Sequence, residues 1–235
     1  PSPYDTNAWP NHSSMFGIID LASLPKDRYY LYRSIWNKEA ETLHILPHWT
    51  WPGREGEVTP VFVYTNYPAA ELFINGKQSK NNSSLKSRYR LMWMDAVYEP
   101  GEVKVVAYDK DGKAVAEKVV RTAGKPHHIE LVSNRNELTA DGKDLAYVTV
   151  KIVDKDGNLC PADNRLINFS VKGAGTYRAG ANGDPTSLDL FHLPKMHAFN
   201  GMLTAIVQTN ETAGEIILTA KAGGVKAGSI RLLTK

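Results

Sequence analysis

Residues 102–120, EVKVVAYDKDGKAVAEKVV, decide the fold class of this protein. Hydrophobic and polar residues alternate through 102–108 and through 114–120, which is the period of a β-strand with one buried face. The DKDG sequence at 109–112 separates the two runs, and its glycine supplies the positive φ that a tight turn needs. The stretch therefore predicts an antiparallel β-hairpin.

The same pattern continues on both sides of this hairpin. Before it, strands are predicted at 58–65, 70–74 and 88–94. After it, glycine-containing turns separate predicted strands at 128–132, 146–154, 166–172, 202–209, 215–220 and 228–233. Gly124 and Pro126 form a joint between the two series, because proline cannot extend a ladder. The sequence thus predicts an all-β fold of two immunoglobulin-like antiparallel β-sandwiches.

The first 40 residues differ from the rest. PKDRYYLYRSIWNKE, which begins at Pro25, predicts a helix with Ser23 as its N-cap. Its predicted buried face consists of Tyr29, Tyr32, Ile35 and Trp36. MFGIID at 15–20 predicts a short strand buried on both faces. One strand-helix unit cannot bury its own faces, so the expected divisions are 1–40, 41–124 and 125–235.

Composition excludes several classes of protein. The 235 residues are 42% hydrophobic and 23% charged, as in ordinary globular domains. A net charge of +3 without any run of Lys or Arg argues against nucleic-acid binding, and no apolar run is long enough to span a membrane. The start, PSPYDTNAWP, has no feature of a signal peptide.

The residue types that perform chemistry are poorly placed for it. The DKDG sequences at 109–112 and 154–157 lack the spacing of a calcium loop and are expected to be solvated hairpin turns. His44, His48, His127 and His128 are expected to be isolated surface or boundary residues. Cys160, the single cysteine, precedes a proline in a turn-like segment, and no G-x-S-x-G motif is present. We therefore expect no metal, no cofactor and no catalytic residue in this chain.

Aromatic residues provide a softer signal. Tyr4, Trp9, His12, Trp49 and Trp51 lie in irregular stretches, where exposed rings are able to stack on sugars. The alternative is that these rings pack between domains. The sequence leaves both interpretations open.

Three groups of motifs resemble a known family. PY at 3–4, WP at 9–10, SSMFGIIDLA at 13–22 and PKDRYYLYRSIW at 25–36 resemble the last βα unit of the (β/α)8 barrel in bacterial glycoside hydrolase family 2 enzymes of the β-galactosidase type. HILPHWTW at 44–51, VYTN at 63–66 and ELFINGK at 71–77 are similar to the immunoglobulin-like domain that follows that barrel. LTADGKDLAYVTVKIVDKDGNLCPADN at 138–164, NGDPTS at 182–187 and AFNG at 198–201 resemble the further C-terminal sandwich.

The resemblance implies a function for the whole enzyme. Family members hydrolyse β-galactosides with retention, using two barrel glutamates that would precede Pro1, so no catalytic residue transfers to this chain. Residues 1–40 become a strand-helix remnant of the barrel, with Tyr4, Trp9 and His12 as candidates for the rim of the sugar pocket. Some members bind sodium or magnesium near the site, but no matching ligand set is found here.

The implied partners are the upstream catalytic domain of the same polypeptide and a β-galactoside, and a homo-oligomer is left open. The expected location is the bacterial periplasm or the extracellular space. The alternative function is a stand-alone cell-surface adhesion or carbohydrate-binding module. The strand-helix unit argues against that alternative, because an adhesion module has no use for it.

One motif carries a specific structural prediction. Asn182, Gly183, Asp184 and Pro185 are expected to form a demanding turn, in which Gly183 takes a positive φ and the polar side chains bond nearby backbone. A contact with the barrel or its substrate, and a metal site, are the other interpretations of this motif.

Overall fold

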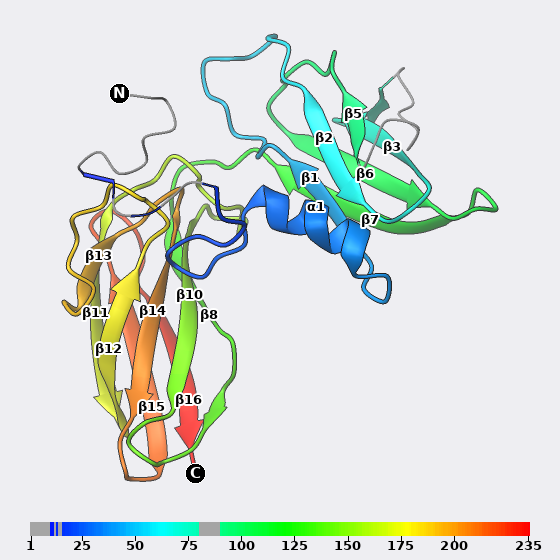
Figure 1. Cartoon of the computed structure of the whole chain (residues 1–235). Coiled ribbons are helices and arrows are strands. Elements are labelled where there is room, and N and C mark those ends of the chain that lie inside the picture. The colour runs from blue at the N-terminus through cyan, green and yellow to red at the C-terminus, as the bar shows by residue number, and fades with distance from the viewer. Residues whose placement is uncertain (1–9, 12, 14–15, 80–89) are drawn as a thin grey trace. The chain divides into compact units, whose positions relative to one another are not determined.

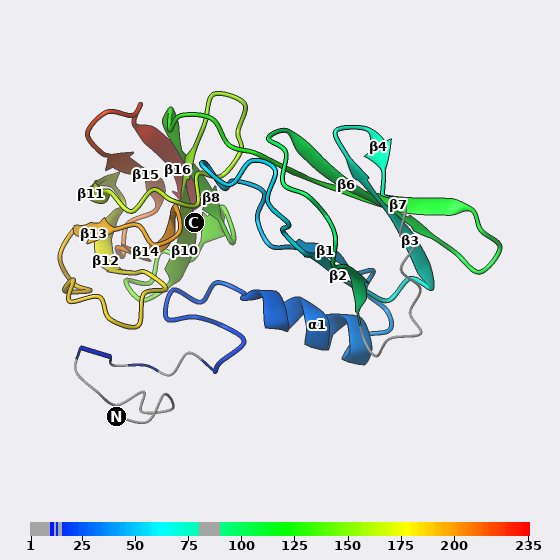
Figure 2. The same ribbon diagram turned by 90° about the horizontal axis from the view of Figure 1, so that it is seen from above.

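The computed structural model describes residues 10–11, 13, 16–79 and 90–235. They form two compact units. The first unit is Pro25–Ala123, and the second combines Gly124–Lys235 with the described residues that precede Pro25. Each unit contains two sheets of almost entirely antiparallel strands, which Figures 1 and 2 show from two directions. The predicted fold class of two antiparallel β-sandwiches is confirmed.

The first unit contains helix α1 (Asp27–Trp36), a three-stranded sheet and a four-stranded sheet. In the three-stranded sheet the order is β1 (Leu43–Leu46), β2 (Val61–Thr65), β5 (Leu91–Trp93). In the four-stranded sheet the order is β4 (Lys77–Gln78), β3 (Ala69–Ile74), β6 (Glu102–Tyr108), β7 (Ala114–Arg121). Buried and partly exposed residues alternate along β6, and the side chains of Val103, Val105 and Ala107 are completely buried. The core of this unit therefore lies between its two sheets.

The hairpin predicted at 102–120 is formed by β6 and β7. Glu102 pairs with Arg121, and the register shifts by one residue next to Tyr108. Gly112 has a φ of 76°, as the turn requires. Local sequence therefore fixes this part of the fold.

The second unit contains a four-stranded and a five-stranded sheet. In the four-stranded sheet the order is β12 (Gly175–Ala181), β14 (Met202–Thr209), β10 (Leu145–Val153), β8 (His128–Ser133). In the five-stranded sheet the order is β13 (Lys195–His197), β11 (Leu166–Gly173), β15 (Gly214–Lys221), β16 (Gly228–Thr234), β9 (Glu137–Leu138). Strands β10 and β14 pair from Leu145 with Gln208 to Lys151 with Met202. Val148, Val150 and Leu203 are completely buried, so the core again lies between two sheets.

The strand predicted at 15–20 is not formed by the described residues of that stretch, 16–20. Phe16 lies in a turn and is 57% exposed, and Ile19 makes only an isolated bridge and is 42% exposed. A strand buried on both faces needs paired neighbours within a covered sheet, and none of the described strands pairs with residues 16–20 in a sheet.

The predicted helix is confirmed as α1, but its predicted N-cap is wrong. Lys26 occupies the N-cap position without a side-chain hydrogen bond, and Ser23 lies in the preceding loop with a φ of 61°. With 10 residues α1 is too short to span a membrane, and the described residues hold no longer helix.

The packed face of α1 also differs from the predicted one. Ser34 is its buried residue, and the ring of Tyr30, one turn earlier, stacks on His44 with 3.9 Å between centroids. Trp36 is 71% exposed, and its ring stacks on that of Tyr32, on the same helix. Aromatic residues with polar tips tolerate water, so their spacing alone misplaced the buried face.

Candidate functional site

The predicted rim residues Tyr4, Trp9 and His12 lie outside the described residues. The structure therefore leaves their proposed contact with sugar as a prediction. The remaining predicted site motif, 182–185, is described in full.

The NGDP motif forms a hydrogen-bonded turn directly after β12. Asn182 is buried, and its Nδ2 donates to the carbonyl oxygen of His197 at 2.9 Å and to Ser187 Oγ at 3.3 Å. Its Oδ1 accepts from the backbone N–H of Asp184 at 3.1 Å. Asp184 Oδ1 in turn accepts from both the backbone N–H and the hydroxyl of Thr186. The polar side chains thus satisfy nearby groups, as such turns require.

Gly183 is needed for a different reason from the predicted one. Its φ is outside the positive range that eleven other glycines adopt. A Cβ added at Gly183 would lie 2.3 Å from Oδ2 of Asp20, far inside contact distance. Gly183 therefore leaves room for the carboxylate of a residue far away in the sequence, which the sequence alone did not reveal.

Asp20 belongs to a short segment that is fixed on the second sandwich. Its Oδ1 accepts from the backbone N–H groups of Ala22 and Leu24, both at 2.9 Å. The carbonyl oxygen of Ala22 accepts from Thr204 Oγ1 at 2.7 Å in a buried hydrogen bond. The contacts at Gly183 and Thr204 hold residues 20–24 against the turn after β12 and against β14.

The two DKDG sequences form the same turn in different surroundings. Asp109 Oδ1 accepts from the N–H groups of Asp111 and Lys113, and Asp154 Oδ1 accepts from those of Asp156 and Asn158. Asp154 alone of these two aspartates is buried. The predicted hairpin turn at 109–112 is confirmed. The turn at 154–157 closes only an isolated bridge between Val153 and Leu159, because β10 and β11 lie in different sheets, and the predicted solvation of its aspartate is wrong.

Asp154 additionally anchors the joint between the two strand series. Its Oδ2 accepts from the N–H of Gly124 at 2.8 Å and from Asn158 Nδ2 at 3.0 Å. Burial opposes ionisation, but these hydrogen bonds together lower the pKa of Asp154 to about 2. The carboxylate is fully used in holding structure and is not available as an acid or a base.

Cys160 is buried, and its thiol is held in the protonated form at neutral pH. Burial, with the nearby charges of Asp154 and Asp163, raises the pKa of its thiol to about 11. A nucleophilic cysteine needs the opposite shift. The structure agrees with the expectation that Cys160 is an ordinary buried residue.

The candidate tryptophans of the first unit pack within that unit. Trp49 is 1% exposed, and its Nε1 donates to the carbonyl oxygen of Glu99 at 2.9 Å. Trp51 stacks on His48, and Arg54 lies 5.1 Å from the centre of its ring. Neither open interpretation holds for Trp49, because it belongs to the core of one sandwich.

His44, His48, His127 and His128 are not isolated, as the sequence suggested, but each contacts another side chain. His44 Nε2 lies 2.7 Å from Asp27 Oδ1. Burial lowers the pKa of His48, against the pull of Asp27. The Nδ1 atoms of His127 and His128 are 3.0 Å apart. Within the described ranges no three His, Cys, Asp or Glu side chains come together as a metal site.

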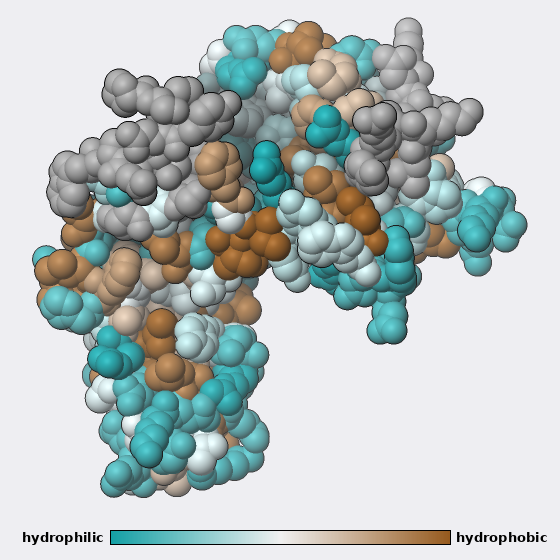
Figure 3. All heavy atoms as spheres, viewed as in Figure 1, coloured by the Kyte–Doolittle hydropathy of each residue, from teal (hydrophilic) through white to brown (hydrophobic). Residues whose placement is uncertain are grey.

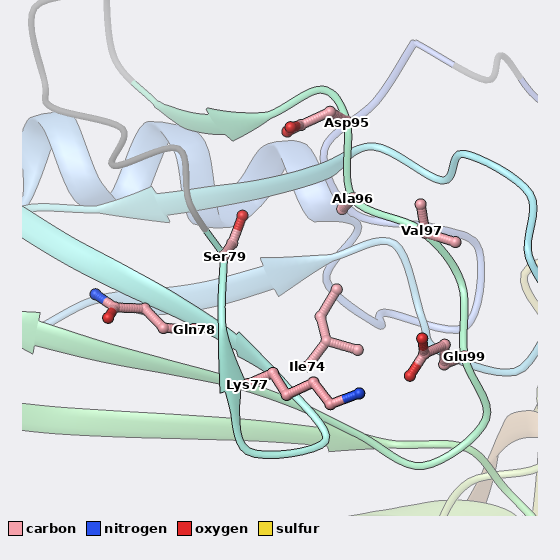
Figure 4. Close-up of a pocket in the computed structure, with 8 residues that line it drawn as sticks. All are labelled: Ile74, Lys77, Gln78, Ser79, Asp95, Ala96, Val97 and Glu99. Carbon is pink, nitrogen blue, oxygen red and sulfur yellow. The ribbon is translucent and has the colours of Figure 1, made fainter.

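A small hollow of about 180 Å³ lies in the first unit (Figure 4). Lys77 and Gln78 from β4 border it on one side, and the segment after β5 contributes the carboxylates of Asp95 and Glu99. Its described lining contains no aromatic ring. The hollow therefore lacks the stacking surface that sugar recognition commonly uses.

Together these features define a class of protein. The described residues form two antiparallel β-sandwiches, in which polar side chains such as those of Asp154 and Asn182 are engaged in turns, so the class is that of a tandem β-sandwich protein. Comparison with known proteins identifies the family.

A family model described as "Glycoside hydrolase family 2 C-terminal domain 5" matches residues 129–231, and one described as "Domain of unknown function (DUF4982)" matches residues 56–116. Beta-galactosidase BoGH2A of Bacteroides ovatus is 42% identical over 99% of this chain and 26% of its own length. A beta-glucuronidase of Formosa agariphila is 27% identical over 92% of this chain and 22% of its own length. The crystal structure of a beta-glycosidase from Bacteroides vulgatus superposes with a TM-score of 0.90 at 33% identity, over 96% of this chain and 29% of that one.

The chain belongs to glycoside hydrolase family 2 and is a C-terminal fragment of such an enzyme. It spans about a quarter of the length of these curated relatives, which supports an upstream catalytic domain in the same polypeptide. The alternative of a stand-alone adhesion module is wrong, because the likeness extends over nearly the whole chain and continues in much longer enzymes.

Proposed function

We propose that this chain is the non-catalytic C-terminal portion of a retaining β-galactosidase, in which it supports the catalytic barrel. The observation that carries the proposal is the 42% identity to a named beta-galactosidase over 99% of the chain. A β-glucuronidase is the second candidate, favoured by a relative that is 27% identical over 92% of the chain.

The chemistry of the described residues fits a supporting role. The buried carboxylate of Asp154 is held ionised by four hydrogen-bond donors, and the thiol of Cys160 is held protonated. Retaining hydrolysis needs two carboxyl groups about 5 Å apart across a sugar. The family resemblance assigns both to barrel strands that precede Pro1.

The full-length enzyme distinguishes the two candidate substrates. We expect hydrolysis of p-nitrophenyl β-galactoside with a kcat/KM at least 100-fold above that for the matching β-glucuronide. The reverse ratio would establish the glucuronidase alternative. Hydrolysis of neither substrate would refute both.

A contact of the N-terminal segment with sugar is a further part of the proposal. Tyr4, Trp9 and His12 precede a helix that resembles the last barrel helix, and barrel active sites form at the nearby rim. In the full-length enzyme, Trp9→Ala is expected to raise KM or lower kcat for the galactoside. An unchanged kcat/KM would assign Trp9 to packing.

We also propose a periplasmic or extracellular location in a bacterium. Fractionation of the native host tests this location. The state of assembly is left open, and size-exclusion chromatography of the full-length enzyme distinguishes a monomer from a homo-oligomer.

A further inference from the structure

An exposed apolar surface lies on the second unit beside the fixed segment 20–24. It consists of four side chains, which we call the apolar ledge: Leu21, Leu188, Leu190 and Phe191, exposed by 38%, 62%, 57% and 48%. Together with Ser187, Asp189 and His192 they line a hollow of about 570 Å³. Figure 3 shows hydrophobic residues on the surface over the loop between β12 and β13, which carries three of the four. Contiguous exposed apolar patches of this kind mark interaction sites.

The loop that carries the ledge is held in place by hydrogen bonds. Asp189 Oδ2 accepts from the backbone N–H of His197 at 2.7 Å and lies 3.0 Å from its Nδ1. The carbonyl oxygen of Phe191 accepts from the N–H of Gly180 at 2.8 Å. The side chains are thus presented to solvent from an ordered backbone, which lowers the entropy lost when a partner covers them.

Leu21 joins this loop to the N-terminal side of the chain. Its neighbours Asp20 and Ala22 are locked against Gly183 and Thr204. Leu21 itself is left at the surface, next to the loop residues of the hollow. The ledge therefore includes part of the segment that precedes Pro25 in the sequence and belongs to the second unit.

We propose that the apolar ledge is the surface on which the second sandwich docks against the catalytic domain of the same polypeptide. This proposal rests on the longer polypeptide and is independent of which sugar the enzyme hydrolyses. The relatives are about four times as long as this chain, so a large covalently attached body is available to cover the ledge.

A second copy of the chain is the less suitable occupant. Four side chains that are already partly covered offer far less than the roughly 800 Å² per partner of a standard interface. A covalently linked domain does not need that area, because linkage gives it an effective concentration in the millimolar range.

Cysteine labelling in the full-length polypeptide tests the proposal. Leu190→Cys is compared with Val132→Cys, a matched control on β8 that is 45% exposed and outside the ledge. Each variant is pulsed with N-ethylmaleimide, and the modified peptide is quantified by mass spectrometry. We expect Leu190→Cys to label at least ten times more slowly than Val132→Cys in the folded protein, and equally fast in denaturant. Leu188→Cys repeats the measurement if Leu190→Cys does not fold.

Equal labelling of the two sites in the folded protein would overturn the proposal. Slow labelling that becomes fast on dilution would also overturn it, because the occupant would then be a second copy. Protection that is independent of concentration supports it. Since labelling does not depend on turnover, an enzyme with protected Leu190→Cys but no galactosidase activity would refute the proposed substrate and leave the docking surface in place.

Discussion

The side chain of Asp20 packs closely against Gly183, and this packing is possible only because position 183 carries no Cβ. Replacing Gly183 by Ala places a Cβ 2.3 Å from the Asp20 carboxylate, so the segment 20–24 must shift or the turn must deform. We expect Gly183→Ala to lower the free energy of unfolding by about 1 to 3 kcal/mol, the usual cost of overpacking. Urea unfolding measures this change, and amide exchange at 20–24 shows whether the segment has been released.

Gly223→Ala is the matched control, because a Cβ at Gly223 meets no atom within 4 Å and its φ lies outside the positive range. Shortening the opposing side chain with Asp20→Ser in the Gly183→Ala background should recover part of the loss. A Gly183→Ala protein as stable as Gly223→Ala would contradict the close contact.

Asp154 provides a prediction about pH. Its folded-state pKa of about 2 lies below the usual value of about 3.9 for an unfolded chain. The ionised group therefore stabilises the fold above pH 4, and this stabilisation, about 2 kcal/mol, is lost as pH falls toward 2. We expect Asp154→Asn to be less stable at pH 7 and to lose less stability between pH 4 and pH 2.

Asp109→Asn is the control for this pair of turns, because Asp109 makes the same backbone hydrogen bonds but lies nearer solvent. Its substitution should change stability much less. Identical acid profiles for Asp154→Asn and the unmodified chain would show that another carboxylate controls acid unfolding.

At the scale of elements, substitutions on helix α1 show which of its faces packs against the first unit. Tyr30 stacks on His44, whereas Trp36 is 71% exposed. We expect Tyr30→Ala to cost about 1 to 3 kcal/mol of stability and Trp36→Ala less than about 0.5 kcal/mol in this chain. Thermal unfolding of the two variants measures the difference in stability. A larger loss of stability for Trp36→Ala would mean that the face predicted from the sequence is the packed one.

The elements that the sequence predicted correctly are those whose signal is local. Strand alternation and the DKDG turns lie within 20 residues of each other, so β6 and β7 follow from 102–120 alone. The strand expected at 15–20 is not formed by residues 16–20, because its burial depended on neighbours that the described part of the chain does not supply. The role of Gly183 was missed for a similar reason, since its partner Asp20 lies far away in the sequence.

At the scale of the whole molecule, the carboxylates of Asp20 and Asp154 hold structure, and the resemblance assigns the catalytic pair to a barrel domain outside this chain. We expect the 235-residue chain alone to release no nitrophenol from a β-galactoside above a buffer blank. Loss of general acid-base catalysis alone removes about 10²- to 10⁴-fold in rate, and loss of the nucleophile removes more. Turnover that copurifies with the chain would place a catalytic site within it.

The hydrogen bond between Thr204 and the carbonyl of Ala22 spans 182 positions of sequence. During biosynthesis residues 20–24 leave the ribosome long before β14 exists, and the whole first sandwich is made in between. Contacts of such high sequence separation are slow to form, because the intervening chain must be ordered first. The segment that carries Leu21 is therefore expected to stay unattached through most of translation and to lock onto the second sandwich as one of the last steps of folding.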